Sequence, residues 1–112
     1  MKSIAVIGSR SFNSYESLKS ILDAEEPSKI ISGGAKGADT LAARYAGENS
    51  IELQEFLPDY GKYGRGAPLV RNKLIVDASD MVIAFWDGKS RGTKYTVDYA
   101  EKQGKEVSVV RG

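Results

Sequence analysis

Short apolar runs alternate with longer amphipathic segments along the chain, and this alternation constrains the fold most strongly. The apolar runs predict strands at residues 4–7, 29–32, 51–57, 81–86 and 106–110. Between them, apolar side chains recur at helical spacing in a segment that ends near residue 24 and over 38–48, 69–78 and 93–103. Strands and helices that alternate in this way predict a parallel sheet with helices on both faces.

The order of the strands follows from the handedness of their connections. Because crossovers between parallel strands are right-handed, few topologies remain. We predict a Rossmann-like α/β three-layer sandwich with a five-stranded parallel sheet in the order 3-2-1-4-5. Ligands bind outside the carboxyl ends of the strands at the switch point, here between the first and fourth strands. This rule selects the loops that follow Ile7, Ser32 and Trp86.

Composition excludes several classes of site. The chain has no cysteine and no histidine, so disulfides, thiolate metal sites and histidine general-base catalysis are excluded, and we expect no metal or cofactor. With 16 basic and 15 acidic residues the net charge is +1, which makes nucleic acid an unlikely partner. The 112 residues predict one domain, 1–112. No apolar run resembles a leader or a membrane span, so we expect a cytoplasmic protein without a membrane partner.

Local signals predict where some helices begin and end. Asn13 followed by Glu16 resembles a capping box for the first helix. Gly104 is the expected residue after the end of the last helix. The segment 58–68 predicts a long loop, in which Tyr60 and Tyr63 either cover the site as a lid or belong to a packed loop.

The loop after the first strand contains Gly8, Ser9 and Arg10. Glycine permits a sharp turn, serine offers a hydrogen bond, and arginine carries a permanent charge that suits phosphate. These three residues are therefore candidates for ligand binding. The alternative is a plain turn with one exposed arginine.

The loop after the second strand is rich in glycine. Its candidate ligand-binding residues are Gly33, Gly34, Ala35, Lys36, Gly37 and Asp39. A glycine-rich loop before a helix exposes backbone N–H groups, and the helix dipole favours an anion beside them. In the alternative interpretation the loop is only a tight turn, and Asp39 stabilises the first turn of the helix.

The loop after the fourth strand again ends at a helix, with Ser90, Gly92 and Thr93 as candidate ligand-binding residues. Thr93 either caps the helix or binds a phosphate, since both uses satisfy the same N–H groups. Trp86 either stacks on a base or covers the edge of the sheet.

Arg71 and Asn72, early in the third predicted helix, either face the same crevice or lie on the surface. Together with the three loops they resemble the YspA-type branch of the SLOG superfamily. The matching segments are 8–12, 33–39, 71–72 and 90–93. The resemblance extends over residues 4–109, and the string Gly-Gly-Ala-Lys-Gly-Ala-Asp is its most specific element. It implies a Rossmann-like fold, nucleotide-derived ligands and a homodimer.

The superfamily includes the LOG phosphoribohydrolases and the DNA-processing protein DprA. LOG enzymes cleave the N-glycosidic bond of a nucleoside monophosphate with an arginine and a glutamate. Arg71 stands at the position of the LOG arginine, whereas Thr96 stands at that of the glutamate. The hydrolytic carboxylate is therefore missing, and Asp39 or Asp87 would have to replace it. We take Arg71 and Asp39 as the candidate catalytic residues.

These observations predict a module that binds a nucleotide or nucleotide-derived phosphate ligand, for sensing or sequestering a signal. One alternative is a LOG-like hydrolase of a nucleotide N-glycosidic bond. The other is a DprA-like nucleic-acid-binding protein. For that last alternative the candidate basic patch is Lys36, Arg65, Arg71, Lys89 and Arg91.

Overall fold

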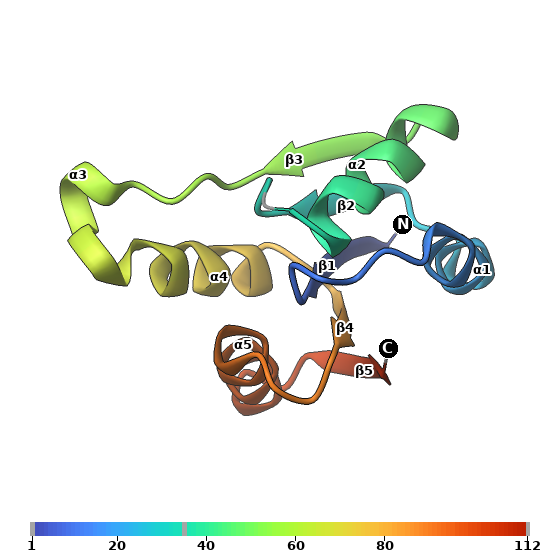
Figure 1. Ribbon diagram of the computed structural model, residues 1–112. Coiled ribbons are helices and arrows are strands. Elements are labelled where there is room, and N and C mark those ends of the chain that lie inside the picture. The colour runs from blue at the N-terminus through green and yellow to red at the C-terminus, as the bar shows by residue number, and fades with distance from the viewer. Residues whose placement is uncertain (1, 35, 112) are drawn as a thin grey trace.

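The structure is a computed structural model that describes residues 2–34 and 36–111. Over these residues it contains a five-stranded, fully parallel sheet in the order β3-β2-β1-β4-β5 (Figure 1). The strands are β1 (Ser3–Gly8), β2 (Lys29–Ser32), β3 (Glu52–Glu55), β4 (Met81–Trp86) and β5 (Glu106–Arg111). The helices are α1 (Tyr15–Glu25), α2 (Ala38–Glu48), α3 (Tyr60–Tyr63), α4 (Ala67–Asp77) and α5 (Arg91–Lys102), with a short 3₁₀ turn η1 (Gly64–Gly66). The predicted fold class and strand order are confirmed.

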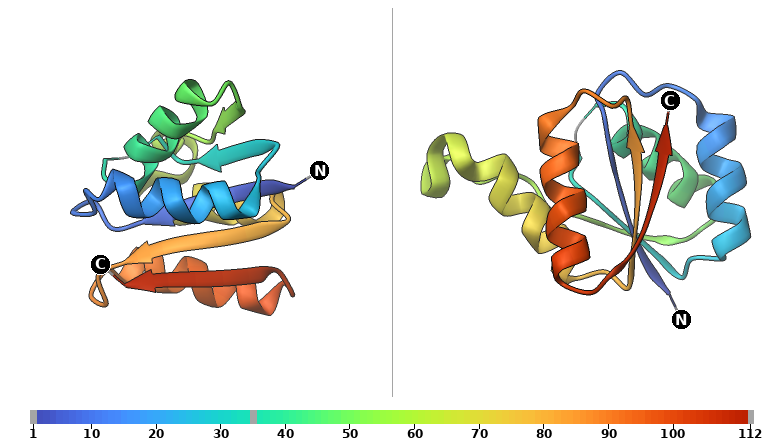
Figure 2. Two further views of the ribbon diagram at one scale, coloured as in Figure 1. Left: turned by 90° about the vertical axis from the view of Figure 1, so that its right-hand side faces the viewer. Right: turned by 90° about the horizontal axis from the view of Figure 1, so that it is seen from below.

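Helices cover both faces of the sheet, with α1 and α2 on one side and α4 and α5 on the other (Figure 2). The alternation of side chains along β1 divides the core into two halves. Ile4 and Val6 pack under α1 and α2, whereas Ala5 and Ile7 pack under α4 and α5. Strands buried on both faces are continuous apolar runs, which is the pattern seen in β1 and β4.

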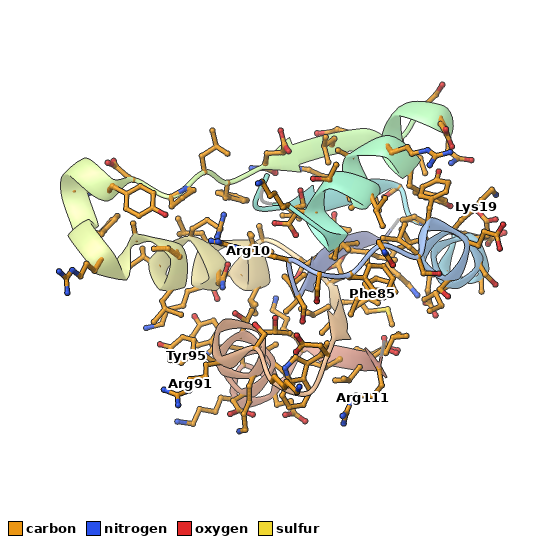
Figure 3. The ribbon with its side chains drawn as sticks, viewed as in Figure 1. Arg10, Lys19, Phe85, Arg91, Tyr95 and Arg111 are labelled. Atoms are coloured by element: carbon orange, nitrogen blue, oxygen red, sulfur yellow. The ribbon has the colours of Figure 1, made fainter. Side chains whose placement is uncertain are left out.

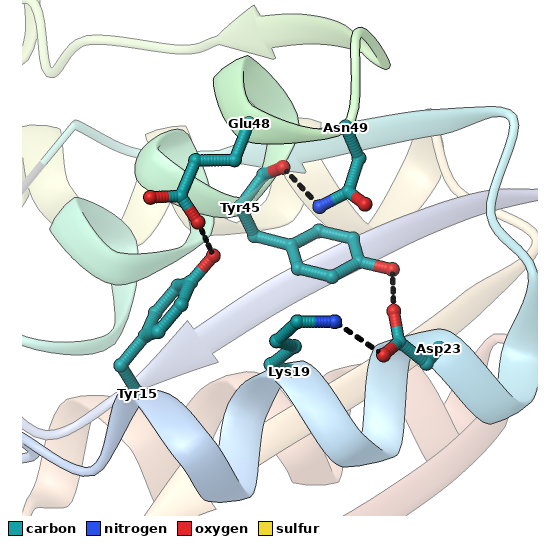
Figure 4. A network of polar contacts seen from close by, with 6 residues as sticks. All are labelled: Tyr15, Lys19, Asp23, Tyr45, Glu48 and Asn49. Carbon is teal, nitrogen blue, oxygen red and sulfur yellow. Dashed lines mark hydrogen bonds and ion pairs between the residues drawn. The ribbon is translucent and has the colours of Figure 1, made fainter.

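Two tyrosines join α1 to α2 on the face away from α4 and α5 (Figure 4). The Tyr15 hydroxyl donates to Glu48 at 2.6 Å, and the Tyr45 hydroxyl donates to Asp23 at 2.7 Å. Burial, and then the Asp23 carboxylate, raise the pKa of Tyr45 to about 12. Hydrogen bonds from Lys19 and then Tyr45 lower the pKa of Asp23. Helices α1 and α2 are thus linked by charged contacts as well as by their apolar faces.

The first helix begins one residue later than the predicted capping box implies. The side chain of Ser14, not Asn13, accepts a hydrogen bond from the Ser17 N–H, at 3.4 Å. The predicted capping box, which has Asn13 as the cap, is therefore wrong. Asn13 is an exposed residue before the cap. Just before the cap, Phe12 is buried against Phe85 with ring centroids 4.6 Å apart. This contact places the chain that enters α1.

The segment predicted as a long loop contains α3 and η1, and it forms an arm beside the start of α4 (Figure 1). Residues 59–66 are all exposed, so the arm is not a packed loop. Tyr60 and Tyr63 are 59% and 41% exposed. Helix α4 begins at Ala67, two residues earlier than predicted, because proline is tolerated in the first turn of a helix. Within the described residues, no helix is long and apolar enough to cross a membrane.

Candidate functional site

A cleft of about 480 Å³ lies at the carboxyl ends of β1 and β4, where the strand order reverses. Residues from α4 and α5 form its walls. The lining residues are Ile7, Gly8, Ser9, Arg10, Ser11, Asp39, Pro68, Leu69, Arg71, Asn72, Ile75, Asp87, Ser90, Gly92, Thr93 and Thr96. Nine of the predicted ligand-binding residues are therefore brought together: Gly8, Ser9, Arg10, Asp39, Arg71, Asn72, Ser90, Gly92 and Thr93.

The other predicted residues do not line this cleft. They are Gly33, Gly34, Lys36, Gly37 and Trp86, while Ala35 lies outside the described residues. Two of the glycines instead allow close approach between segments. A Cβ on Gly33 would lie 2.8 Å from the Arg71 Cζ, and one on Gly37 would lie 2.8 Å from the Arg10 Cα. The glycine-rich loop thus lets Arg71 and the backbone of Arg10 approach it at points where a side chain would collide with them.

Ser9 connects the loop after β1 to the loop after β4. Its N–H donates to the Phe85 carbonyl at 2.9 Å, and its Oγ accepts from the Asp87 N–H at 3.1 Å. The residue is only 3% exposed. Both loops therefore keep a fixed position relative to each other at the base of the cleft.

Asp87 organises the loop that leads into α5. Its Oδ1 accepts from the N–H groups of Lys89 and Ser90, both at 2.8 Å. These backbone hydrogen bonds, that from Lys89 first, lower the pKa of Asp87. A carboxyl group whose pKa is lowered stays ionised near neutral pH, so Asp87 is poorly suited to act as a general acid.

The N-terminus of α5 opens onto the cleft. Ser90 is the N-cap, and its Oγ accepts from the Thr93 N–H at 3.3 Å. The predicted helix start at Thr93 is therefore two residues too late, since α5 begins at Arg91, and of the two roles considered for Thr93 the cap belongs to Ser90 instead. The first N–H groups of a helix have no partner within the helix and carry the positive end of its dipole. Since Ser90, Gly92 and Thr93 line the cleft, it presents a favourable place for an anion.

Arg71 is not a solvated surface arginine, because two fixed groups hold it. Its Nη1 donates to the Gly33 carbonyl at 2.7 Å, and its Nε donates to the Asn72 Oδ1 at 2.7 Å. Asn72 in turn donates through Nδ2 to the Thr96 Oγ1 at 2.9 Å. These contacts join α4 to the loop after β2 and to α5. The guanidinium therefore lines the cleft in a defined position.

Trp86 is half-buried at the end of β4. Its Nε1 donates to the Ser90 carbonyl at 2.9 Å, and the Arg111 guanidinium lies 5.5 Å from its ring centroid. Figure 3 places Arg111 at the end of β5, and Arg91 and Tyr95 along α5. The tryptophan therefore contacts the residue that caps α5 and an arginine of β5.

Three lining residues of α4 were not singled out from the sequence: Pro68, Leu69 and Ile75. Pro68 and Ile75 stand four residues before and three residues after Asn72, which is the spacing of neighbours on one helix face. Helical periodicity around Asn72 therefore predicts that these residues share its face of the helix. Among the described residues, no three acidic side chains gather as a metal site.

Comparison with known proteins identifies the family. The model of the YspA, cpYpsA-related SLOG family matches residues 2–63. The chain belongs to this family. The Gene 61 protein of Mycobacterium phage D29 is 34% identical to this SLOG chain over 84 residues, covering 70% of the chain and 67% of the phage protein. The resemblance drawn from the loop motifs is confirmed.

Solved structures of DNA-processing protein A share the fold of this SLOG chain. The Streptococcus pneumoniae protein matches with a TM-score of 0.84 and 21% sequence identity. The match covers 100% of this chain and 51% of the S. pneumoniae chain. The Helicobacter pylori protein matches with a TM-score of 0.74 and 25% identity, over 96% and 64%. The SLOG chain thus spans from half to under two thirds of these proteins. Because the H. pylori protein is described with a single-stranded DNA binding mode, balanced charge alone does not exclude a nucleic-acid partner.

Proposed function

We propose that this SLOG protein binds a nucleoside phosphate in the cleft between β1 and β4, with Arg71 and the N-terminus of α5 holding the phosphate. One observation carries the proposal: a guanidinium fixed by two hydrogen bonds and the start of a helix line the same cleft. Both groups favour a negatively charged oxygen. A volume of about 480 Å³ lies in the usual range for small-molecule sites.

The charges that line the cleft favour one phosphate joined to a polar group over several phosphates in a row. Arg10 and Arg71 supply positive charge, whereas Asp39 and Asp87 supply negative charge. Carboxylates accept hydrogen bonds from hydroxyl and amino groups and repel phosphate oxygens. A nucleoside monophosphate offers both kinds of group, since its ribose and base carry donors and its phosphate carries charge.

We propose binding without hydrolysis. Thr96 stands at the position of the LOG glutamate, so this position has no carboxylate. Its hydroxyl accepts a hydrogen bond from Asn72 and donates its hydrogen to the Gly92 carbonyl, so that hydrogen is not available to a ligand. Asp87 has a lowered pKa, which does not suit protonation of a leaving base. Incubation with AMP should therefore release no adenine. Release of free adenine that is lost in Asp39→Asn would favour the hydrolase instead.

The test is ligand-dependent thermal stabilisation with a panel of nucleoside phosphates, AMP first. At 100 times the dissociation constant, a ligand adds about 2.7 kcal/mol to the free energy of unfolding. We expect Arg71→Ala to weaken the stabilisation strongly, with residual binding at high AMP concentration, and the matched variant Arg65→Ala, on the exposed arm, to retain it in full. No stabilisation across the panel would refute the proposal.

Single-stranded DNA is the second candidate ligand, because the H. pylori protein, which is 25% identical to this chain, has a single-stranded DNA binding mode. The two candidates differ in their dependence on salt. Contacts with many phosphates make affinity fall steeply with salt concentration, whereas a single phosphate contact does so weakly. Retention of a DNA oligonucleotide at 50 mM salt that is lost at 200 mM, without stabilisation by AMP, would favour DNA.

We also propose that the protein forms a homodimer. Exposed apolar side chains of the arm and of α4 and α5 support this proposal. Outside the cleft they are Tyr60, Tyr63, Leu74 and Tyr95. Light scattering after size-exclusion chromatography should give twice the chain mass of 12.1 kDa, and a mass of 12.1 kDa would refute it.

A further inference from the structure

We propose that Asn72 and Thr96 are positioning residues that hold the Arg71 guanidinium in one orientation for a ligand phosphate. The inference rests on the proposed function, because it assigns the phosphate of a nucleotide to Arg71. The role that it assigns to Thr96 is structural and not catalytic. Thr96 anchors a series of hydrogen bonds that runs through Asn72 to Arg71 in the cleft.

The chemistry at the two ends of this chain of hydrogen bonds determines its direction. Arginine has only donors, so the Asn72 atom at 2.7 Å from the Arg71 Nε is the amide oxygen. The amide nitrogen of Asn72 therefore donates to the Thr96 Oγ1, at 2.9 Å. Thr96 must donate its own hydrogen to the Gly92 carbonyl, at 2.8 Å, because a carbonyl can only accept. The opposite orientation of the amide would set its NH2 group against the Arg71 Nε–H, so that two donors would face each other.

The hydrogen bonds of Arg71 connect it to two separate parts of the fold, to α5 through Asn72 and directly to the loop after β2. Thr96 is 1% exposed inside α5, and its partner Gly92 belongs to the backbone of the same helix. The second anchor is the Gly33 carbonyl, which accepts from Nη1 at 2.7 Å. Contacts at both Nε and Nη1 fix the plane of the guanidinium, because a planar fork has little freedom once two of its donors are held. The remaining N–H groups are left for the cleft that Arg71 lines.

An orientation fixed before binding reduces the entropy lost when the ligand binds. Without the hydroxyl of Thr96, the Asn72 amide loses its anchor and the Arg71 side chain regains rotational freedom. We expect Thr96→Val to raise the dissociation constant for AMP about 10-fold, which corresponds to about 1.4 kcal/mol. Thr96→Ser keeps the hydroxyl and should bind AMP within about 2-fold of the original protein.

A first experiment needs no ligand. In ¹⁵N-labelled protein, the Nε–H resonance of Arg71 is assigned by its loss in Arg71→Lys, and its exchange with water is measured. We expect exchange that is slow relative to the exposed Arg65, at least 10-fold faster in Thr96→Val, and slow again in Thr96→Ser. Equal exchange in Thr96→Val and the original protein would overturn the positioning role. Should Thr96→Val fail to fold, Asn72→Ala removes the same anchor and should give the same fast exchange.

A second experiment is a double-mutant cycle in which AMP affinity is measured by calorimetry. In the Arg71→Ala background, Thr96→Val should have no further effect, because the side chain that it positions is gone. An additive loss would show that Thr96 acts through the general fold and would overturn the inference. If the original protein does not bind AMP, the proposed function is in question, while the exchange rates of Arg71 still decide the positioning role.

Discussion

Replacing Gly33 by alanine adds one methyl group at the point where Arg71 crosses the loop after β2. The new Cβ would lie 2.8 Å from the Arg71 Cζ and 3.0 Å from its Cδ. Gly33 does not need a positive φ angle, so alanine causes no backbone strain there. Since the obstructing atoms belong to a flexible side chain, Arg71 would swing away and lose its hydrogen bond to the Gly33 carbonyl.

The expected cost in stability is small. A hydrogen bond to a charged group contributes about 1.5–3 kcal/mol, with the lower end fitting a half-buried arginine. Replacing glycine by alanine also stabilises the folded state by about 0.4–1 kcal/mol, because it lowers the conformational entropy of the unfolded chain. The net loss is therefore about 1 kcal/mol, equivalent to a fall of about 4 °C in Tm for a domain of this size. Affinity for AMP should fall at least 10-fold, because the guanidinium has lost an anchor.

Gly8 provides the contrasting variant. A Cβ there would lie 2.5 Å from the Phe85 carbonyl oxygen and 2.8 Å from the Ala38 Cβ, and neither atom can rotate away. Gly8→Ala would push β1 from β4 and α2, at a cost of about 3 kcal/mol or more. Urea unfolding followed by the fluorescence of Trp86, the only tryptophan, measures both variants. The reasoning is refuted if Gly33→Ala is as unstable as Gly8→Ala, or if it binds AMP with unchanged affinity.

Substitutions also test two contacts away from the cleft. The pKa of Tyr45 is raised from 10.0 to about 12, so its contribution to stability is fully present below pH 10 and is lost as pH rises towards 12. The difference in unfolding free energy between the original protein and Tyr45→Phe should therefore shrink by up to about 2 to 3 kcal/mol between pH 9 and pH 12; a constant difference would contradict the raised pKa. At the start of α1, Ser14→Ala should cost about 1 kcal/mol in urea unfolding, whereas Asn13→Ala should cost almost nothing. The reverse order would contradict Ser14 as the cap.

Local patterns predict two strands and one helix to the residue. The bounds of β2, β4 and α2 are those predicted, because glycine or aspartate directly flanks an apolar run or an amphipathic segment there. Gly104 follows the end of α5 with a positive φ of 74°, as its position predicted. In each case neighbouring residues decide the structure, so the signal is contained in a few consecutive positions.

Helix starts were predicted less well, because two suitable cap residues stood close together. Asn13 and Ser14 both favour an N-cap, and the burial of Phe12 against Phe85 determines how the chain enters α1. In the same way Ser90 and Thr93 can both cap, and Ser90 is held by the Asp87 carboxylate. At α1 the choice therefore depended on a residue distant in the sequence, whereas at α5 it depended on a hydrogen bond within the loop itself.

The sequence by itself determined the sheet, its strand order and the end at which the cleft lies, since alternation and the handedness of crossovers are local properties. Only the tertiary structure decided which residues line the cleft. Arg71 reaches the carbonyl of Gly33, 38 positions away, whereas Gly33 itself does not line the cleft. Which backbone atom a long side chain reaches depends on how α4 packs against the sheet, and no periodicity in the sequence encodes that distance.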